Sequence, residues 1–163
     1  MSEGMDAIIR VGIAEAALAR SGQRIRTAGL GSCVGVVLYD PEAAIAGLAH
    51  VMLPSPPGPE PVNSAKYGST AIPWLAEQLR AHGANLRRLC AKLAGGAQMF
   101  APSRSDLLRV GPRNVEAVLS ALDTLGVPVV AQDTGGHVGR TIEFDVSTGA
   151  LSVRTARGAA YTI

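Results

Sequence analysis

Short apolar runs bounded by turn-forming residues fill the first third of the chain. Residues 34–39 (VGVVLY) form a continuous apolar run, which is typical of a strand buried on both faces. Residues 45–53 predict a second strand, and residues 24–28 predict another that leads into the first run through a glycine-containing turn. Residues 7–13 are apolar and β-branched, so we expect a strand there, although the alanine-rich sequence that follows to residue 19 also fits a helix.

The segment between the two central runs, Asp40-Pro41-Glu42-Ala43, has the composition of a turn and predicts a β-hairpin. If Pro41 and Glu42 are its two loop residues, Cys33 lies directly opposite His50 and their β-carbons are about 4.5–5.5 Å apart. A four-residue loop moves this pair to a diagonal on the same face, whereas a three-residue loop places the two side chains on opposite faces. The relation between Cys33 and His50 therefore depends on the hairpin register.

The rest of the chain alternates helical periodicity with short strand-like runs. One helix is expected from Asn63 or Ser64 to about residue 81, with Pro73 near its first turns and His82-Gly83 at its end. A second is introduced by residues 111–114 and stopped by Gly126. The proline-rich segment 54–62 is expected to be an exposed loop. Further strands are expected at residues 86–93, 127–132, 140–146 and 151–155, the last two joined by a three-residue loop at 147–149.

Length and composition narrow the class of protein. A chain of 163 residues has the size of one globular domain, and the order of elements predicts a single mixed α and β domain, with residues 1–6 as a flexible N-terminus. A formal net charge of +2 is too small to indicate a nucleic-acid partner. The N-terminal apolar stretch is interrupted by charged residues, so we expect neither a signal peptide nor a membrane span.

The cysteines and histidines are few and scattered. Two cysteines, Cys33 and Cys90, do not make a disulfide scaffold, which favours a reducing compartment. Three single histidines without metal-ligand spacing give no signature of a metal site, and none is expected.

Cys33 and His50 are the best candidates for chemistry. A cysteine beside a histidine is the minimal pair of nucleophile and base, because the thiolate is the reactive species and a nearby imidazolium lowers the thiol pKa. Gly29 and Gly31 would expose the backbone next to Cys33, so that the N–H groups of Ser32 or Cys33 could donate to an oxyanion. The hydroxyl of Thr27, on the adjoining strand, could orient His50 or the substrate amide.

Structural explanations for the same residues stay open at this point. Free cysteine and a single histidine on an apolar strand are often core residues. We expect Cys90 to be a buried core residue and His82 to cap a helix C-terminus. The glycine-rich segment 135–139 fits either a site loop or a plain turn, and Met99-Phe100 fits either a core position or an exposed contact for a partner.

Several blocks of the sequence, in order from about residue 8 to residue 154, closely resemble the CheD family of chemoreceptor glutamine deamidases. They are Thr27-x-Gly29-Leu30-Gly31-Ser32-Cys33-Val34, Asp40-Pro41, Ala49-His50-Val51-Met52-Leu53-Pro54, Lys66-Tyr67, residues 91–100 (AKLAGGAQMF), Gly111-x-Arg113-Asn114, Asp133-Thr134-Gly135-Gly136 and Gly139-Arg140.

The resemblance implies an α/β (α+β) sandwich of mixed sheets flanked by helices, similar to toxin-type cysteine deamidases. It also implies a cytoplasmic hydrolase that converts glutamine side chains of methyl-accepting chemotaxis receptors to glutamate, without a cofactor. By the same resemblance, Cys33 is the nucleophile, His50 the base and Thr27 the third site residue. Gly31 and Ser32 are expected near the oxyanion. Family members bind the phosphatase CheC, for which Gly95, Gly96, Met99 and Phe100 are the candidate surface.

Two other functions use the same residues. A cysteine peptidase or small-molecule amidase would employ the same pair, whereas a non-catalytic adaptor for a receptor or for CheC would leave Cys33 dispensable.

Overall fold

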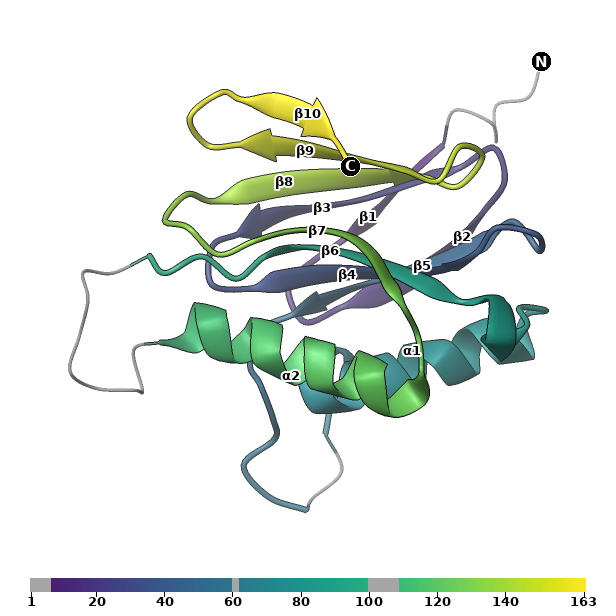
Figure 1. Ribbon diagram of the computed structural model, residues 1–163, viewed down its shortest axis with the longest axis horizontal. Coiled ribbons are helices and arrows are strands. Elements are labelled where there is room, and N and C mark those ends of the chain that lie inside the picture. The colour runs from purple at the N-terminus through teal and green to yellow at the C-terminus, as the bar shows by residue number, and fades with distance from the viewer. Residues whose placement is uncertain (1–6, 60–61, 100–108) are drawn as a thin grey trace.

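The protein consists of two five-stranded β-sheets and two α-helices stacked in three layers, as the computed structural model shows for residues 7–59, 62–99 and 109–163 (Figure 1). The first sheet has the strand order β1-β3-β8-β9-β10, and the second has the order β2-β5-β4-β6-β7. In Figure 1 the first sheet lies at the top, the second below it and the helices at the bottom. The expected sandwich of mixed sheets with flanking helices is therefore confirmed.

The strands of the first sheet are β1 (Ile8–Val11), β3 (Arg24–Leu30), β8 (Arg140–Asp145), β9 (Ala150–Thr155) and β10 (Ala160–Thr162). Those of the second are β2 (Ala16–Arg20), β4 (Val34–Asp40), β5 (Ile45–Val51), β6 (Cys90–Gly95) and β7 (Val129–Thr134). The pairs β1–β3 and β6–β7 are parallel and the others antiparallel, so both sheets are mixed.

The second sheet is buried on both faces because it lies between the first sheet and the helices. Along β4, Val34, Val36 and Leu38 pack in the cluster on the helix side, while Val37 packs in the cluster between the sheets. Side chains alternate in the same way along β5, so that Ala46 and Leu48 face the first sheet. By this alternation His50 also points into the space between the two sheets.

Both helices cover the second sheet with one apolar face. Helix α1 (Gly68–Ala81) buries Ile72, Leu75 and Leu79, and α2 (Val110–Leu125) buries Val118 and Leu122. As expected, α1 ends at His82, and Gly126 follows α2 in the left-handed conformation. Two short 3₁₀ helices, η2 (Ser64–Lys66) and η3 (Leu86–Arg88), precede α1 and β6, and Asn63 caps η2 rather than α1. Among the residues that the structure describes, no helix is long and apolar enough to cross a membrane.

Several element predictions were wrong. The alanine-rich segment after residue 13 forms an edge strand, β2, which pairs with β5, and β10 was not predicted. The strand expected over residues 86–93 begins only at Cys90, after η3. The loop between β8 and β9 has four residues rather than three, because Asp145 pairs with Ala150.

The central hairpin also differs from its expected register. Asp40 pairs with Ile45, so the loop has the four residues 41–44, and His50 lies opposite Gly35 rather than opposite Cys33. The Asp40 side chain sets this loop, since its Oδ1 accepts hydrogen bonds from the backbone N–H groups of Glu42 and Ala43, at 3.0 and 3.1 Å. Cys33 and His50 therefore lie on a diagonal of the same face, which is the alternative that a four-residue loop predicts.

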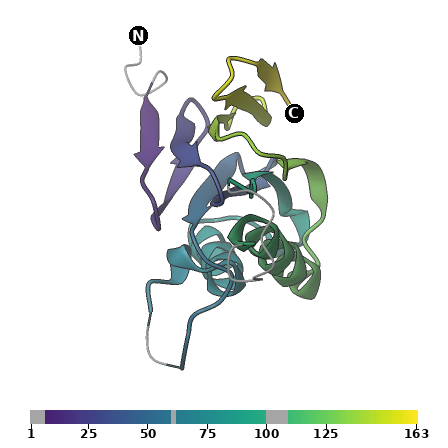
Figure 2. The same cartoon turned by 90° about the vertical axis from the view of Figure 1, so that its left-hand side faces the viewer.

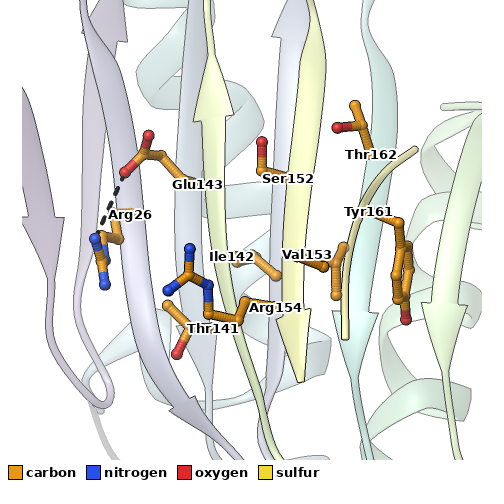
Figure 3. Close-up of a pocket in the computed structure, with 10 residues that line it drawn as sticks. Arg26, Thr141, Ile142, Glu143, Ser152, Val153, Arg154, Tyr161 and Thr162 are labelled. Atoms are coloured by element: carbon orange, nitrogen blue, oxygen red, sulfur yellow. Dashed lines mark ion pairs between the residues drawn. The ribbon is translucent and has the colours of Figure 1, made fainter. Parts of the chain in front are cut away.

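The outer face of the first sheet is open and polar. A pocket of about 440 Å³ lies on it, and Figure 3 shows Arg26, Glu143 and Arg154 among its lining residues. This pocket is lined by residues of β3, β8, β9 and β10, and neither Cys33 nor His50 contributes to it.

Candidate active site

The candidate site lies between the two sheets, where β3 ends and β4 begins. This end of the sandwich is on the left in Figure 1 and faces the viewer in Figure 2. Thr27 on β3 and His50 on β5 meet there across the interface, with 2.7 Å between Thr27 Oγ1 and His50 Nδ1. Both side chains are buried, at 1% and 0% exposed. Two of the three residues expected in the site are thus in direct contact.

The contacts of Thr27 fix the tautomer of His50. The Thr27 hydroxyl donates to the backbone carbonyl of Val11 at 2.7 Å. Because a hydroxyl has only one proton, its oxygen must accept from His50, and Nδ1 therefore carries the imidazole proton. The other ring nitrogen, Nε2, is left with its lone pair, which is the form that a general base requires.

His50 Nε2 is buried and has no hydrogen-bond partner within the described part of the chain. Buried polar atoms in native proteins are nearly always paired, so an unpaired one points to a role outside the fold itself. Gly35, directly opposite His50, carries no side chain into this space; a β-carbon there would lie 2.6 Å from Cδ1 of Ile142. The unpaired nitrogen thus lies on the face that Cys33 shares.

Cys33 precedes β4 and is half-buried, packed beside the cluster that fills the space between the sheets. His50 by contrast is fully enclosed. Cys33 is thus the more accessible of the two residues.

Burial opposes ionisation of both groups in the resting site. It raises the pKa of the Cys33 thiol and lowers the pKa of His50. Burial therefore acts against the expected lowering of the thiol pKa by a charged imidazole. It favours a thiol and a neutral imidazole in the resting site.

The turn that carries Cys33 is held by its carbonyl groups. The carbonyls of Gly31 and Cys33 accept hydrogen bonds from the backbone N–H groups of Ala97 and Gly96, at 2.9 and 2.8 Å. The Gly31 N–H donates to Gly29, so it is not free for a substrate. The N–H groups of Ser32 and Cys33 have no acceptor among the described residues, as the expected oxyanion donors require.

Asn114 is a functional candidate that sequence reasoning missed. Its fully buried amide donates to the carbonyl of Ser32, next to Cys33, and to the carbonyl of Met52, two residues after His50. Asn114 belongs to the Gly111-x-Arg113-Asn114 block of the family resemblance, but the sequence did not indicate its contacts, because both of them are formed by the tertiary structure.

The residues expected on a partner surface do not lie together on the outside. Gly95 and Gly96 are buried directly under the turn that carries Cys33; a β-carbon on Gly95 would be 2.3 Å from the carbonyl oxygen of Cys33. Met99 is 48% exposed and its side chain packs near Gly31. Phe100 lies outside the described residues. A partner surface therefore stays a prediction for Met99.

The remaining candidates have structural contacts. Cys90 is half-buried rather than buried, and its Sγ lies 3.7 Å from the carbonyl oxygen of Tyr39. His82 caps the C-terminus of α1, as expected. In the glycine-rich segment, Gly136 accepts a hydrogen bond from the N–H of Gln98, and His137 Nδ1 lies 2.9 Å from the Gln98 carbonyl. Among the described residues, no three His, Cys, Asp or Glu side chains are grouped so that they could hold a metal ion.

Comparison with known proteins gives one consistent result. The family model described as "CheD chemotactic sensory transduction" matches residues 52–155. Curated relatives extend the similarity across the segment that contains Thr27, Cys33 and His50. One from Bacillus velezensis, named chemoreceptor glutamine deamidase CheD, is 45% identical over 100% of both chains.

Other relatives have the same kind of name. A probable chemoreceptor glutamine deamidase CheD of Geobacillus kaustophilus is 53% identical, covering 91% of this chain and 92% of its own. The chemoreceptor glutamine deamidase CheD of Bacillus licheniformis is 50% identical, covering 96% and 95%.

One solved structure, the hypothetical protein YfiH of Bacillus licheniformis, is similar in fold, with a TM-score of 0.50 and 14% identity over 75% of this chain and 51% of its own. At that identity the similarity concerns the fold alone. The family match and the near full-length relatives at 45–53% identity show that the chain belongs to the CheD family.

Proposed function

We propose that this protein hydrolyses glutamine side chains in the cytoplasmic region of methyl-accepting chemotaxis receptors to glutamate, with release of ammonia. Cys33 is the nucleophile, His50 the base and Thr27 the residue that orients the base. The observation that carries the proposal is the hydrogen-bond chain Val11–Thr27–His50, which leaves an unpaired Nε2 on the face of the sheet that bears the half-buried Cys33.

The first half of the reaction forms a thioester. His50 Nε2 takes the proton of the Cys33 thiol as the sulfur attacks the carboxamide carbon, and the carbonyl oxygen becomes an oxyanion. The N–H groups of Ser32 and Cys33 stabilise that oxyanion. The carbon–nitrogen bond then breaks, and the departing nitrogen takes the proton from the His50 imidazolium and leaves as ammonia.

The second half returns the enzyme to its starting state. His50 Nε2 removes a proton from water, whose oxygen attacks the thioester carbon, and a second oxyanion forms in the same place. The carbon–sulfur bond breaks, and the Cys33 sulfur recovers its proton from His50. The product is a carboxylic acid, which releases its proton to the solvent and becomes a glutamate side chain, so each turnover adds one negative charge to the receptor.

The neutral resting pair suits a nucleophile of this kind. A thiol of raised pKa is a weak nucleophile in the empty site, and the adjacent base activates it when the substrate amide excludes water. This arrangement protects the half-buried sulfur from oxidation between turnovers, because oxidation follows thiolate character.

The proposal is tested by mass spectrometry of receptor cytoplasmic fragments incubated with the protein. Conversion of an amide to an acid adds about one dalton at each modified glutamine, which the acyl-transfer reaction requires. We expect this gain with the wild type and no gain with Cys33→Ala or His50→Ala. Cys90→Ala is the matched control, since Cys90 is also half-buried, and it should retain activity.

The outcomes separate the other functions. Equal conversion by Cys33→Ala would overturn the assignment of the nucleophile. A wild-type protein that binds the receptor or CheC but converts no glutamine would indicate an adaptor. Cleavage of free glutamine or of peptide bonds in preference to receptor glutamines would indicate an amidase or a peptidase.

A further inference from the structure

The side chain of Asn114 joins the two segments that carry the proposed nucleophile and base. Its Nδ2 donates to the carbonyl of Ser32 at 2.9 Å and to the carbonyl of Met52 at 3.1 Å. Ser32 immediately precedes Cys33, and Met52 follows His50 by two residues. In Figure 1, the first turns of α2, which hold Asn114, lie at the same end of the molecule as the start of β4.

The hydrogen bond to Ser32 fixes the direction of the Cys33 N–H. The described chain contains no cis peptide bond, and in a trans peptide the N–H points away from the C=O of the same unit. Because Asn114 holds the Ser32 carbonyl, the N–H of Cys33 points to the side opposite the Asn114 amide. That N–H has no acceptor among the described residues.

The neighbouring carbonyls are held differently. Those of Gly31 and Cys33 accept from the backbone N–H groups of Ala97 and Gly96, which no substitution of a side chain removes. In this turn, the peptide between Ser32 and Cys33 depends on a side chain for its orientation. Within this turn, a change at position 114 therefore acts on the peptide between Ser32 and Cys33.

The stability of the fold alone does not explain an asparagine at position 114. Its Oδ1 is buried and has no hydrogen-bond partner in the described part of the chain. A buried acceptor without a partner lowers stability, whereas an apolar side chain of the same size would not. Position 114 thus carries an amide although the unpaired Oδ1 lowers the stability of the fold. This indicates a role for the two hydrogen bonds that Nδ2 donates.

We propose that Asn114 is a positioning residue for the oxyanion. By holding the Ser32 carbonyl, it orients the Cys33 N–H toward the oxygen of the tetrahedral intermediate, and by holding Met52 it keeps that turn aligned with His50. This inference rests on the proposed function, since it assigns part of the oxyanion stabilisation to a residue of α2.

The experiment compares two reactions of the same sulfur. Deamidation of a receptor fragment passes through an oxyanion, whereas alkylation of Cys33 by iodoacetamide is a displacement at a saturated carbon and does not. Asn114→Leu keeps the approximate size of the side chain and removes both donors. We expect it to slow deamidation about 100-fold, the effect of losing one oxyanion donor. The rate of alkylation should change less than about 3-fold, because that reaction forms no oxyanion.

Two further variants complete the design. Asn114→Ser retains one donor and should be intermediate in deamidation, and it provides the same comparison if Asn114→Leu does not fold. Asn85→Leu is the control, because Asn85 also bonds to a backbone group through its side chain but lies beside Asp40, at the other end of β4. It should leave both rates unchanged.

Deamidation by Asn114→Leu at the wild-type rate would overturn the proposal. So would a parallel fall in deamidation, alkylation and melting temperature, because that pattern describes a structural role only. If the wild-type protein does not deamidate the fragment, the proposed function itself is contradicted. The wild-type measurement therefore distinguishes this failure from a failure of the proposal for Asn114.

Discussion

Thr27 and His50 come from different sheets and share one short hydrogen bond, 2.7 Å between Oγ1 and Nδ1, at the interface of the sandwich. The bond has a defined direction because the Thr27 proton is already donated to Val11. The relation makes Thr27 an acceptor that holds the ring and selects its tautomer, as the carboxylate of a Ser-His-Asp triad does. A neutral hydroxyl in that position leaves the imidazolium less stabilised than a carboxylate would.

Replacement of Thr27 by Val should therefore impair catalysis more than folding. The variant keeps the shape of the side chain but removes the acceptor for His50 Nδ1, so the unprotonated nitrogen is no longer held toward Cys33. We expect kcat for deamidation to fall about 100-fold, within the range for general acid–base contributions, and the free energy of unfolding to fall by about 1–3 kcal/mol because Val11 loses its donor. Ammonia release and thermal denaturation measure the two effects.

Thr27→Ser is the matched control for that change. It keeps the hydroxyl and loses one buried methyl group, which costs about 1 kcal/mol. Its kcat should stay near the wild-type value. A Ser variant as slow as the Val variant would show that the methyl group, and not the hydroxyl, is what the site requires.

The pH dependence of deamidation should show the lowered pKa of His50. The base must be unprotonated, and burial lowers its pKa below the ordinary value of about 6.5. We expect kcat/KM to be level between about pH 7 and 8 and to fall only on the acid side of about 6.5. Rates of ammonia release in a series of buffers give the profile; an acid limb centred above 6.5 would contradict the neutral resting site.

The same neutral pair predicts a slow reaction of the free enzyme with iodoacetamide. Because burial raises the pKa of the Cys33 thiol, little thiolate exists at neutral pH, and the rate of alkylation should rise with pH beyond the ordinary titration range of cysteine near 8.5. Labelling of Cys33 followed by mass spectrometry measures this. Rapid labelling at pH 6 to 7 would indicate a thiolate–imidazolium pair instead.

Local patterns predicted most of the elements, because their signals lie within a few residues. The apolar run of β4 and the terminal Gly126 of α2 are examples. The strand β2 was missed since alanine has no strand preference of its own and is held here by pairing with β5. The hairpin loop was misread because Ala44 adopts the left-handed conformation, with φ 54°, where glycine or asparagine would have signalled the longer turn.

The site was predictable in its residue types but not in its contacts. Cys33, His50 and Thr27 stand out as reactive or polar residues beside apolar strands. The acceptor of the Thr27 proton and both acceptors of the Asn114 amide are backbone carbonyls, which any sequence supplies. Contacts of this kind are set by how the sheets and α2 pack, so no pattern along the chain indicates them.

Gly95 lies under the turn that carries Cys33, and its substitution should displace Cys33. Its φ is 113°, and a β-carbon would lie 2.3 Å from the Cys33 carbonyl oxygen. Gly95→Ala should lower deamidation by about 100-fold or more, the effect of misplacing a reacting group by about 1 Å. Gly158→Ala is the control: its φ of 95° carries a similar backbone strain, about 1–2 kcal/mol, but nothing lies within 4 Å of the added carbon. Retained activity in both variants would show that the turn tolerates displacement.

Asp40 connects the stability of the hairpin to the geometry of the site, because the loop it sets determines that His50 lies opposite Gly35. Burial alone would raise the pKa of Asp40, but hydrogen bonds from Arg88 and from the backbone of Asn85 and Ala43, together with the Arg88 charge, lower it to about 2. The folded pKa thus lies below the unfolded value of about 4, and the unfolded state binds more protons between these limits. The resulting stability is present above about pH 4 and is lost as the pH falls to about 2.

Asp40→Asn should therefore lower the free energy of unfolding at pH 7 by about 1–3 kcal/mol, since the turn and Arg88 lose a charged acceptor, and should reduce the loss of stability between about pH 4 and 2. Urea unfolding at several pH values measures both effects. Glu42→Gln is the control, because Glu42 is an exposed partner of the same Arg88, and such pairs contribute about 0–1 kcal/mol. An Asp40 variant with wild-type stability but lower activity would show that the carboxylate sets the register without holding the fold, whereas unchanged stability and activity would show that the backbone alone determines the four-residue loop.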